Sequence, residues 1–170
     1  MPSPSGAVRI QSPGEASAHE RSRPAGSAGS IAVGMRFDTK IAIIVLEELA
    51  AWQKLNVTAF LSGGLVAAAP ELGGEAYRDG SGKVYGPLAR QPILIFAATS
   101  ADLTRVLRRA GEAGLTPSLY TRELFATGHD EANRAAVAAV ATDALDLVGI
   151  ALHGERKAVD KAIKGLKLHP

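Results

Sequence analysis

The stretch KIAIIVL at residues 40–46 decides the fold, because it is an unbroken run of mostly branched apolar residues. It shows no alternation of apolar and polar positions, which predicts a strand buried on both faces. Strands of this kind are typical of α/β proteins, in which helices cover both faces of a sheet. Two further runs have the same character, PILIFAA at 92–98 and DLVGIAL at 146–152. The sequence therefore predicts an α/β fold.

Helical and turn-forming segments separate these buried runs. Helices are expected over residues 55–68, 100–113, 132–141 and 155–166. A short strand is expected at 117–121, and a hairpin around the turn residues Asp79 to Gly82. Strands and helices alternate with connections of about 12 to 20 residues, which favours crossovers between parallel strands. We predict a single-domain three-layer α/β/α sandwich with a mixed, largely parallel sheet.

The first 34 residues differ from the rest of the chain. They are rich in Ser, Pro, Gly and Ala, lack periodicity and contain few large apolar residues. Such a composition cannot offset the entropy of ordering, so we predict a disordered tail over residues 1–34. Met35 stands directly before the first structured segment and is an alternative start. Residues 35–170 are predicted to form the single α/β domain.

Composition excludes several classes of function. The chain has 170 residues, with 19 Lys and Arg against 17 Asp and Glu, so its net charge is only +2 and nucleic-acid binding is disfavoured. It has no cysteine, and its four histidines show no metal-ligand spacing. No apolar run approaches the ~18–20 residues that cross a bilayer. We expect a soluble, cytoplasmic protein without metal or cofactor, and a homodimer is left open.

Polar residues are concentrated in YTRELFATGHDEANRAA at 120–136, between a predicted strand and a predicted helix. The segment from Thr127 to Asp130 has the form of a helix N-terminal cap. The Thr127 hydroxyl would accept from a free backbone N–H, and the Asp130 carboxylate would reach back to the helix start. A free helix N-terminus also suits an anion. The alternative is that these residues only begin a helix and satisfy a loop.

Two sets of segments resemble known families. The C-terminal half, QPILIFAATSADLTRVLRRAGEAGLTPSLY followed by DLVGIALHGERKAVDKAIKGLKLH, resembles the peptidyl-tRNA hydrolase II fold. More closely, KLNVTAFLSGG with YTRELFATGHDEANRAA resembles a bacterial family known only as a domain of unknown function, DUF2000, grouped with that fold. The resemblance covers about residues 38–170. It implies a peptidyl-tRNA hydrolase II-like sheet and leaves the activity open.

The hydrolase's own motif is incomplete in this chain. By the resemblance, Lys54 stands for the first lysine of that motif, and Asn56 occupies the place of the catalytic second lysine. Gly63 falls where the family has a histidine, and Arg122 corresponds to its aspartate. A neutral amide cannot supply an ammonium charge, and Arg122 reverses the sign of a carboxylate. Retained peptidyl-tRNA hydrolysis is therefore not expected.

The remaining polar residues define a candidate site. The predicted ligand-binding residues are Lys54, Asn56, Thr58, Thr121, Arg122, Thr127 and Asn133. His129 beside Asp130 is the candidate general base, with Arg122 holding an anionic substrate. A histidine at a helix start is more often structural.

Three functions follow from this candidate site. The first is a protein that binds a small anionic ligand and lacks hydrolase activity. The second is a hydrolase or transferase that uses His129, Asp130 and Arg122. The third is a peptidyl-tRNA hydrolase-like or tRNA-associated protein. Whether the chain is an enzyme stays open, and if it is one, the hydrolase class is expected.

Overall fold

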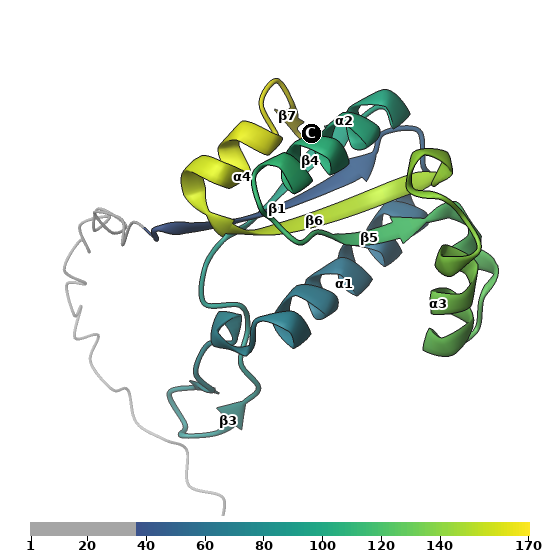
Figure 1. Ribbon diagram of the computed structural model, residues 1–170. Coiled ribbons are helices and arrows are strands. Elements are labelled where there is room, and N and C mark those ends of the chain that lie inside the picture. Colours follow the sequence, from purple (N-terminus) through teal and green to yellow (C-terminus); the bar gives the residue numbers. More distant parts are fainter. Residues whose placement is uncertain (1–36) are drawn as a thin grey trace, which may run out of the picture. The chain divides into compact units, whose positions relative to one another are not determined.

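The computed structural model describes residues 37–170 (Figure 1). The predictions about residues 1–34 and Met35 lie outside the described residues. The strands are β1 (Thr39–Leu46), β2 (Tyr77–Arg78), β3 (Val84–Tyr85), β4 (Ile93–Ala98), β5 (Ser118–Thr121), β6 (Leu147–Glu155) and β7 (Lys167–Leu168). The α-helices are α1 (Ala51–Ala68), α2 (Ser100–Glu112), α3 (Asp130–Ala138) and α4 (Arg156–Ala162). Short 3-10 turns are η1 (Pro70–Leu72), η2 (Arg122–Ala126) and η3 (Thr142–Ala144).

Five strands form one mixed sheet in the order β5-β6-β1-β4-β7. Within residues 37–170, only β1 and β4 of this sheet pair in parallel, and its other three pairs are antiparallel. The prediction of a mixed sheet is confirmed, but the prediction that it is largely parallel is wrong. A strand that is covered on both faces is apolar throughout whether it runs parallel or antiparallel to its neighbours. The sequence pattern therefore does not indicate that β6 runs antiparallel to β1 and β5. Because α3 connects two antiparallel neighbours, β5 and β6, it does not act as a crossover helix.

Three strands nevertheless end at the same edge of the sheet. Both β1 and β5 run antiparallel to β6, so they point the same way, and β4 runs parallel to β1. The loops after Leu46, Ala98 and Thr121 therefore meet at one edge.

Helices cover both faces of the sheet, as predicted for three layers. Figure 1 shows α1 on one face and α2 with α4 on the other. The core is made of branched side chains from the central strands and from the inner sides of α1 and α2, such as Ile43, Ile44, Val57 and Leu103, all fully buried. Among the described residues, no helix is long and apolar enough to cross a membrane.

A glycine sets how closely α1 approaches the sheet. A Cβ on Gly149 of β6 would lie far inside van der Waals contact of Val57 Cγ1, and 3.0 Å from Leu61 Cδ1. Both residues belong to the buried side of α1. The position of α1, and of everything attached to it, therefore depends on the missing side chain at Gly149.

Several element boundaries differ from the predicted ones. Helix α1 begins at Ala51, before the predicted residue 55. Its start is stabilised by the backbone N–H of Ala50, which donates to Gln53 Oε1 at 3.1 Å. Helix α4 ends at Ala162, short of residue 166, and the chain turns at Gly165, where φ is +95°, into the unpredicted strand β7. Trp52, the first residue after Ala51 in α1, is 63% exposed and does not belong to the core.

Candidate functional site

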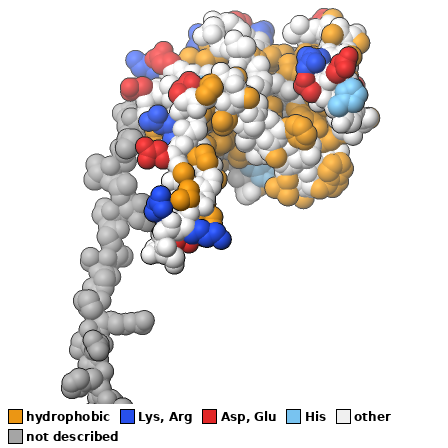
Figure 2. Space-filling model, turned by 90° about the horizontal axis from the view of Figure 1, so that it is seen from below, with side chains coloured by type: hydrophobic (Ala, Val, Ile, Leu, Met, Phe, Trp, Pro, Cys, Tyr) orange, Lys and Arg blue, Asp and Glu red, His pale blue; other side chains and the backbone are white. Residues whose placement is uncertain are grey.

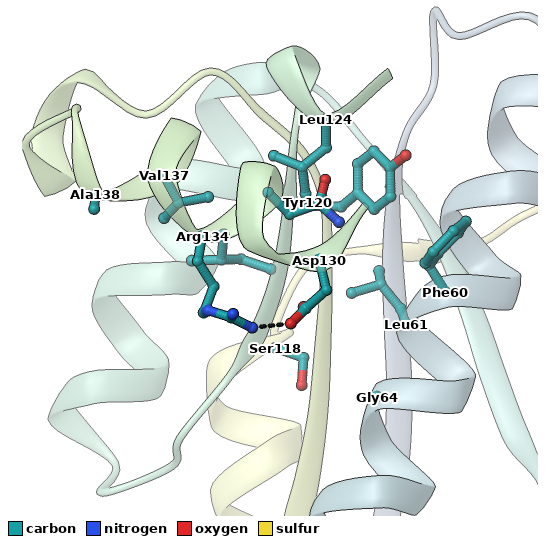
Figure 3. A pocket seen from close by; sticks show the side chains of 12 residues that line it. Phe60, Leu61, Gly64, Ser118, Tyr120, Leu124, Asp130, Arg134, Val137 and Ala138 are labelled. Atoms are coloured by element: carbon teal, nitrogen blue, oxygen red, sulfur yellow. Dashed lines mark ion pairs between the residues drawn. The ribbon is translucent and has the colours of Figure 1, made fainter. Parts of the chain in front are cut away.

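A cleft of about 560 Å³ opens between α1 and α3, beside the edge strand β5 (Figure 3). Most of its wall is apolar, and four polar side chains interrupt it. The apolar lining consists of Phe60, Leu61, Gly64, Leu119, Tyr120, Leu124, Val137 and Ala138. The polar lining consists of Ser118, Asp130, Asn133 and Arg134. We refer to this hollow as the α1–α3 cleft.

Tyr120 holds the inner wall of the α1–α3 cleft together. Its ring lies 5.2 Å from that of Phe125 and 5.9 Å from that of Phe60, measured between ring centroids. Its hydroxyl donates to Asn56 Oδ1 at 3.1 Å, which ties β5 to α1. Burial raises the pKa of the Tyr120 hydroxyl, so the group stays protonated and remains a donor at neutral pH. Asn56, a predicted ligand-binding residue, therefore supports the wall from behind.

The outer side of α1 extends the apolar surface beyond the α1–α3 cleft. Trp52, Leu55 and Phe60 are 63%, 73% and 59% exposed, respectively. Figure 2, the view from below, shows hydrophobic side chains gathered on this face of the molecule. Trp52 also makes an edge contact with Phe125 of η2, with 5.7 Å between ring centroids. The prediction of a homodimer stays a prediction, since a single chain is described.

The cap of α3 lies two residues later than predicted. His129, with extended backbone, is the N-cap, and its Nδ1 accepts the N–H of Ala132 at 3.3 Å. The Thr127 hydroxyl instead points at two acceptors, the carbonyl oxygen of Leu124 at 2.9 Å and Oδ1 of Asn133, to which it can donate. The prediction that Thr127 caps the helix is therefore wrong. Thr127 fixes the turn before α3 and holds Asn133 against the cleft.

Asp130 and Arg134 form an ion pair one helical turn apart at the rim of the α1–α3 cleft (Figure 3). Their side chains are 79% and 68% exposed. Asp130 thus pairs forward along α3 and does not reach back to the helix start as predicted. Across residues 37–170, no hydrogen bond or ion pair joins His129 to Asp130. A catalytic role for these two residues stays a prediction.

Arg122 lies outside the α1–α3 cleft, at the edge where β1 and β5 end. Its Nε donates to Asp146 Oδ2 at 2.7 Å, and its backbone N–H to the carbonyl of the same residue at 2.9 Å. A carboxylate oxygen of Glu48 lies 3.9 Å from its Nη2. The carboxylates of Asp146 and Glu48 therefore already balance the positive charge of Arg122.

The other predicted ligand-binding residues do not join the cleft. The Thr58 hydroxyl donates to the carbonyl of Lys54 at 2.8 Å, inside α1. Lys54 is half-buried and does not line the cleft. Thr121 is 1% exposed, and its hydroxyl has no partner in the described part of the chain. A shift in the β5–β6 register after Tyr120 places Thr121 opposite Leu147.

Sequence reasoning found two of the lining residues, Asp130 and Asn133, and missed the others. Arg134 carried a signal, because it follows Asp130 by four residues and so shares its helix face. The apolar lining carried none, since Phe60 or Leu124 is indistinguishable in sequence from a core residue. Within residues 37–170, no three His, Asp or Glu residues lie close enough together to hold a metal ion.

The structure is that of a mixed α/β protein with the α1–α3 cleft beside its edge strand β5. Residues 39–170 match the family described as "Protein of unknown function (DUF2000)", and the chain belongs to this family. It is similar to a solved protein of unknown function from Agrobacterium tumefaciens strain C58, with 52% identity and a TM-score of 0.77. That match covers 79% of this chain and 100% of the other. No curated protein matches.

Proposed function

We propose that this protein binds a small amphipathic molecule in the α1–α3 cleft and is not a peptidyl-tRNA hydrolase. One observation carries the proposal: an apolar cleft of about 560 Å³ bears its polar side chains together on α3 and at Ser118. Small-molecule sites typically have about 300–1,000 Å³, mostly apolar walls and a few polar groups that fix orientation. The cleft meets all three criteria.

The apolar walls favour a ligand with an apolar body. Phe60 and Leu61 of α1 face Leu124 of η2 and Val137 of α3 across the hollow. A ligand that covers these side chains removes apolar surface from water, which stabilises the complex by about 25 cal/mol per Å². Polar groups at one rim would then fix which end of the ligand points outward.

The predicted anionic ligand has support at Arg134 and not at Arg122. Arg122 already has Asp146 and Glu48 as partners, so an anion there would compete with two carboxylates. Arg134 has one exposed partner, Asp130, and exposed pairs of this kind contribute only about 0.3–0.5 kcal/mol. A ligand carboxylate can therefore pair with Arg134 without breaking a strong interaction.

Two neighbouring glycines of α1 allow a sharp test of the proposed site. Gly64 lines the cleft, and a Cβ there has its nearest neighbour, Ser118 Oγ, at 3.8 Å, so Gly64→Leu fits the backbone and fills the hollow. Gly63 does not line the cleft, and a Cβ there meets nothing within 4 Å, so Gly63→Leu is the matched control. We expect Gly64→Leu to weaken binding of the amphipathic dye anilinonaphthalene sulfonate at least tenfold, measured by fluorescence titration, while Gly63→Leu keeps wild-type affinity. Equal affinities in both variants would refute the cleft as the binding site.

The hydrolase or transferase alternative has less support. His129 uses Nδ1 on the Ala132 N–H, and Arg122 is paired with Asp146, so the three proposed groups have separate partners. The peptidyl-tRNA hydrolase-like or tRNA-associated alternative is also weaker, because Asn56 is bonded to Tyr120 where the resemblance implies a catalytic lysine. Purified protein should release no peptide from peptidyl-tRNA above background. Turnover that disappears in Lys54→Ala would reinstate that activity.

A further inference from the structure

The charges at the rim of the α1–α3 cleft are balanced and lie side by side. Asp130 and Arg134 are the two charged residues of the lining, and each has the other as its ion-pair partner. Both belong to one face of α3, a turn apart. In Figure 3 their side chains lie together above Ser118, between α3 and α1. The rim therefore offers one carboxylate and one guanidinium next to an apolar wall.

A ligand head with a single charge pairs with only one of these two groups and lies beside a like charge on the other. An anionic head that approaches Arg134 meets the Asp130 carboxylate beside it, and a cationic head that approaches Asp130 meets the Arg134 guanidinium. A head with both charges meets no such repulsion. It exchanges one exposed ion pair for two, and the planar guanidinium can hold a carboxylate through two parallel hydrogen bonds.

We infer that the ligand is a zwitterion of the amino-acid type with a large apolar side chain. Its carboxylate binds Arg134, its ammonium group binds Asp130, and its side chain lies among Phe60, Leu124 and Val137. This inference rests on the proposed binding function of the cleft and names the chemical class of its ligand. Asp130 and Arg134 act in it as specificity residues, and no bond is made or broken.

Three probes that share one side chain test the inference by calorimetric titration. L-Phenylalanine carries both charges, 3-phenylpropanoate lacks the ammonium group, and 2-phenylethylamine lacks the carboxylate. We expect wild-type protein to bind phenylalanine at least tenfold more tightly than either of the others. Asp130→Asn should abolish the advantage over 3-phenylpropanoate, and Arg134→Gln the advantage over 2-phenylethylamine.

A second exposed ion pair supplies the matched control. Arg108 and Glu112 on α2 are also four residues apart, with Nη1 and Oε1 separated by 2.5 Å, and neither lines the cleft. Glu112→Gln should leave all three affinities unchanged, which separates a ligand contact from a general effect of charge. A loss of phenylalanine binding in Glu112→Gln equal to that in Asp130→Asn would overturn the inference.

The inference and the proposed function fail differently. Suppose that wild-type protein binds the dye and that Gly64→Leu weakens this binding, but phenylalanine binds no better than its two analogues. The cleft is then a binding site, and the zwitterion assignment is wrong. If Gly64→Leu changes the affinity of neither the dye nor phenylalanine, the proposed function itself is wrong. Phenylalanine binding that survives both charge substitutions also overturns the inference.

Discussion

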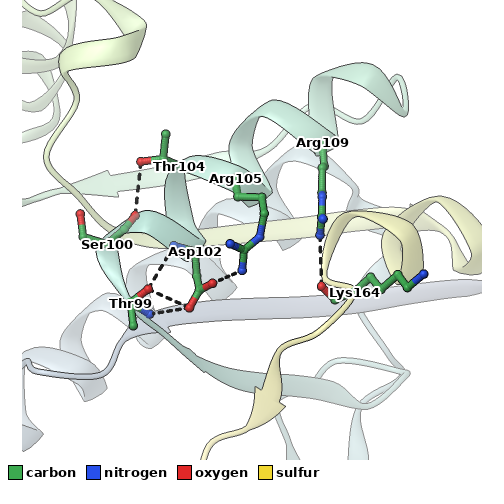
Figure 4. Close-up of polar contacts among 7 residues, drawn as sticks. All are labelled: Thr99, Ser100, Asp102, Thr104, Arg105, Arg109 and Lys164. Atoms are coloured by element: carbon green, nitrogen blue, oxygen red, sulfur yellow. Dashed lines mark hydrogen bonds and ion pairs between the residues drawn. The ribbon is translucent and has the colours of Figure 1, made fainter.

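Single side chains at the ends of strands decide how this protein is assembled around its cleft. Tyr120 of β5 contacts α1 through Asn56 and Phe60, and contacts η2 through Phe125. This one residue therefore joins β5, α1 and η2. Thr99, directly after β4, fixes the start of α2 through hydrogen bonds with Asp102 (Figure 4). Its hydroxyl oxygen accepts the N–H of Asp102 at 3.2 Å, and the Asp102 carboxylate accepts the Thr99 N–H at 3.1 Å. This reciprocal pair satisfies two of the backbone donors that a helix start leaves free.

The capping carboxylate makes the stability of α2 depend on pH. The hydrogen bond from the Thr99 hydroxyl, then that from the Thr99 backbone N–H, and the nearby Arg105 charge lower the pKa of Asp102. A carboxyl group whose folded-state pKa is depressed contributes stability above its unfolded pKa of about 3.9, and this stability is lost as the pH falls through the folded value. We expect Asp102→Asn to cost on the order of 1 kcal/mol at pH 7 and progressively less below about pH 4. Urea unfolding of both proteins at pH 7, 5 and 3 measures the difference, and a constant difference across this range would contradict the assignment.

Residue-level prediction from sequence reached only the part of the cleft lining whose placement is local. The polar stretch at 120–136 does supply Asp130 and Asn133 to a cleft, because both follow directly from a strand end and a helix start. It misplaced the cap, since Thr127 and His129 can both accept a backbone hydrogen bond and the backbone conformation decides between them. The pairing of Arg122 with Asp146 did not show in the sequence, because Asp146 lies 24 residues further along the chain.

At the level of elements, α1 packs closely against β6 at Gly149, because glycine has no side chain to keep the helix away. Gly149→Ala would push its Cβ into Val57, whose branched side chain has little freedom to rotate away inside a helix. We expect a loss of roughly 1–3 kcal/mol, the usual cost of overpacking a core. Thermal or urea unfolding measures the change.

A second substitution shows whether the Gly149 effect is steric. Val57→Ala removes the blocking methyl groups, so Gly149→Ala should cost clearly less in that background than in wild type. A double-mutant cycle gives the coupling directly. Equal costs in both backgrounds would place the strain elsewhere in β6. Gly80, whose added Cβ meets nothing within 4 Å, is the control position and should tolerate alanine.

The direction of strands was the part of the fold that the sequence did not determine. The runs at 40–46, 92–98 and 146–152 predicted three strands correctly, and most of β1 and β6 is buried. In β4 only Phe96 and Ala98 are buried, so the prediction that this strand is fully buried is wrong. Their relative direction depends on whether the connecting helix crosses the sheet. Helix α2 packs on a face of the sheet, whereas α3 has no fully buried residue and connects β5 to its antiparallel neighbour β6. That difference created the cleft, because α3 stands across from α1 and leaves space between them.

At the scale of the whole molecule, the apolar sheet and its covering helices lie within the segment matched by the family, residues 39–170. The last residues of that segment belong to the sheet: β7 pairs with β4, and the N–H of His169 donates to the carbonyl of Ile95 at 2.9 Å. The first 34 residues, by contrast, offer few large apolar side chains to bury. The two ends of the chain are therefore expected to respond differently to truncation.

A chain that begins at Met35 should unfold at the same temperature as the full chain, because a segment with few large apolar residues has little to contribute to a core. Removal of Lys167 to Pro170 should lower the unfolding temperature, since it takes away β7 and exposes the edge of β4. Differential scanning calorimetry of the three proteins compares the two ends directly. A drop for the Met35 variant comparable to that of the C-terminal truncation would show that residues 1–34 contribute to the fold. Unchanged dye binding in the α1–α3 cleft of the Met35 variant would further locate the proposed site entirely within the matched segment.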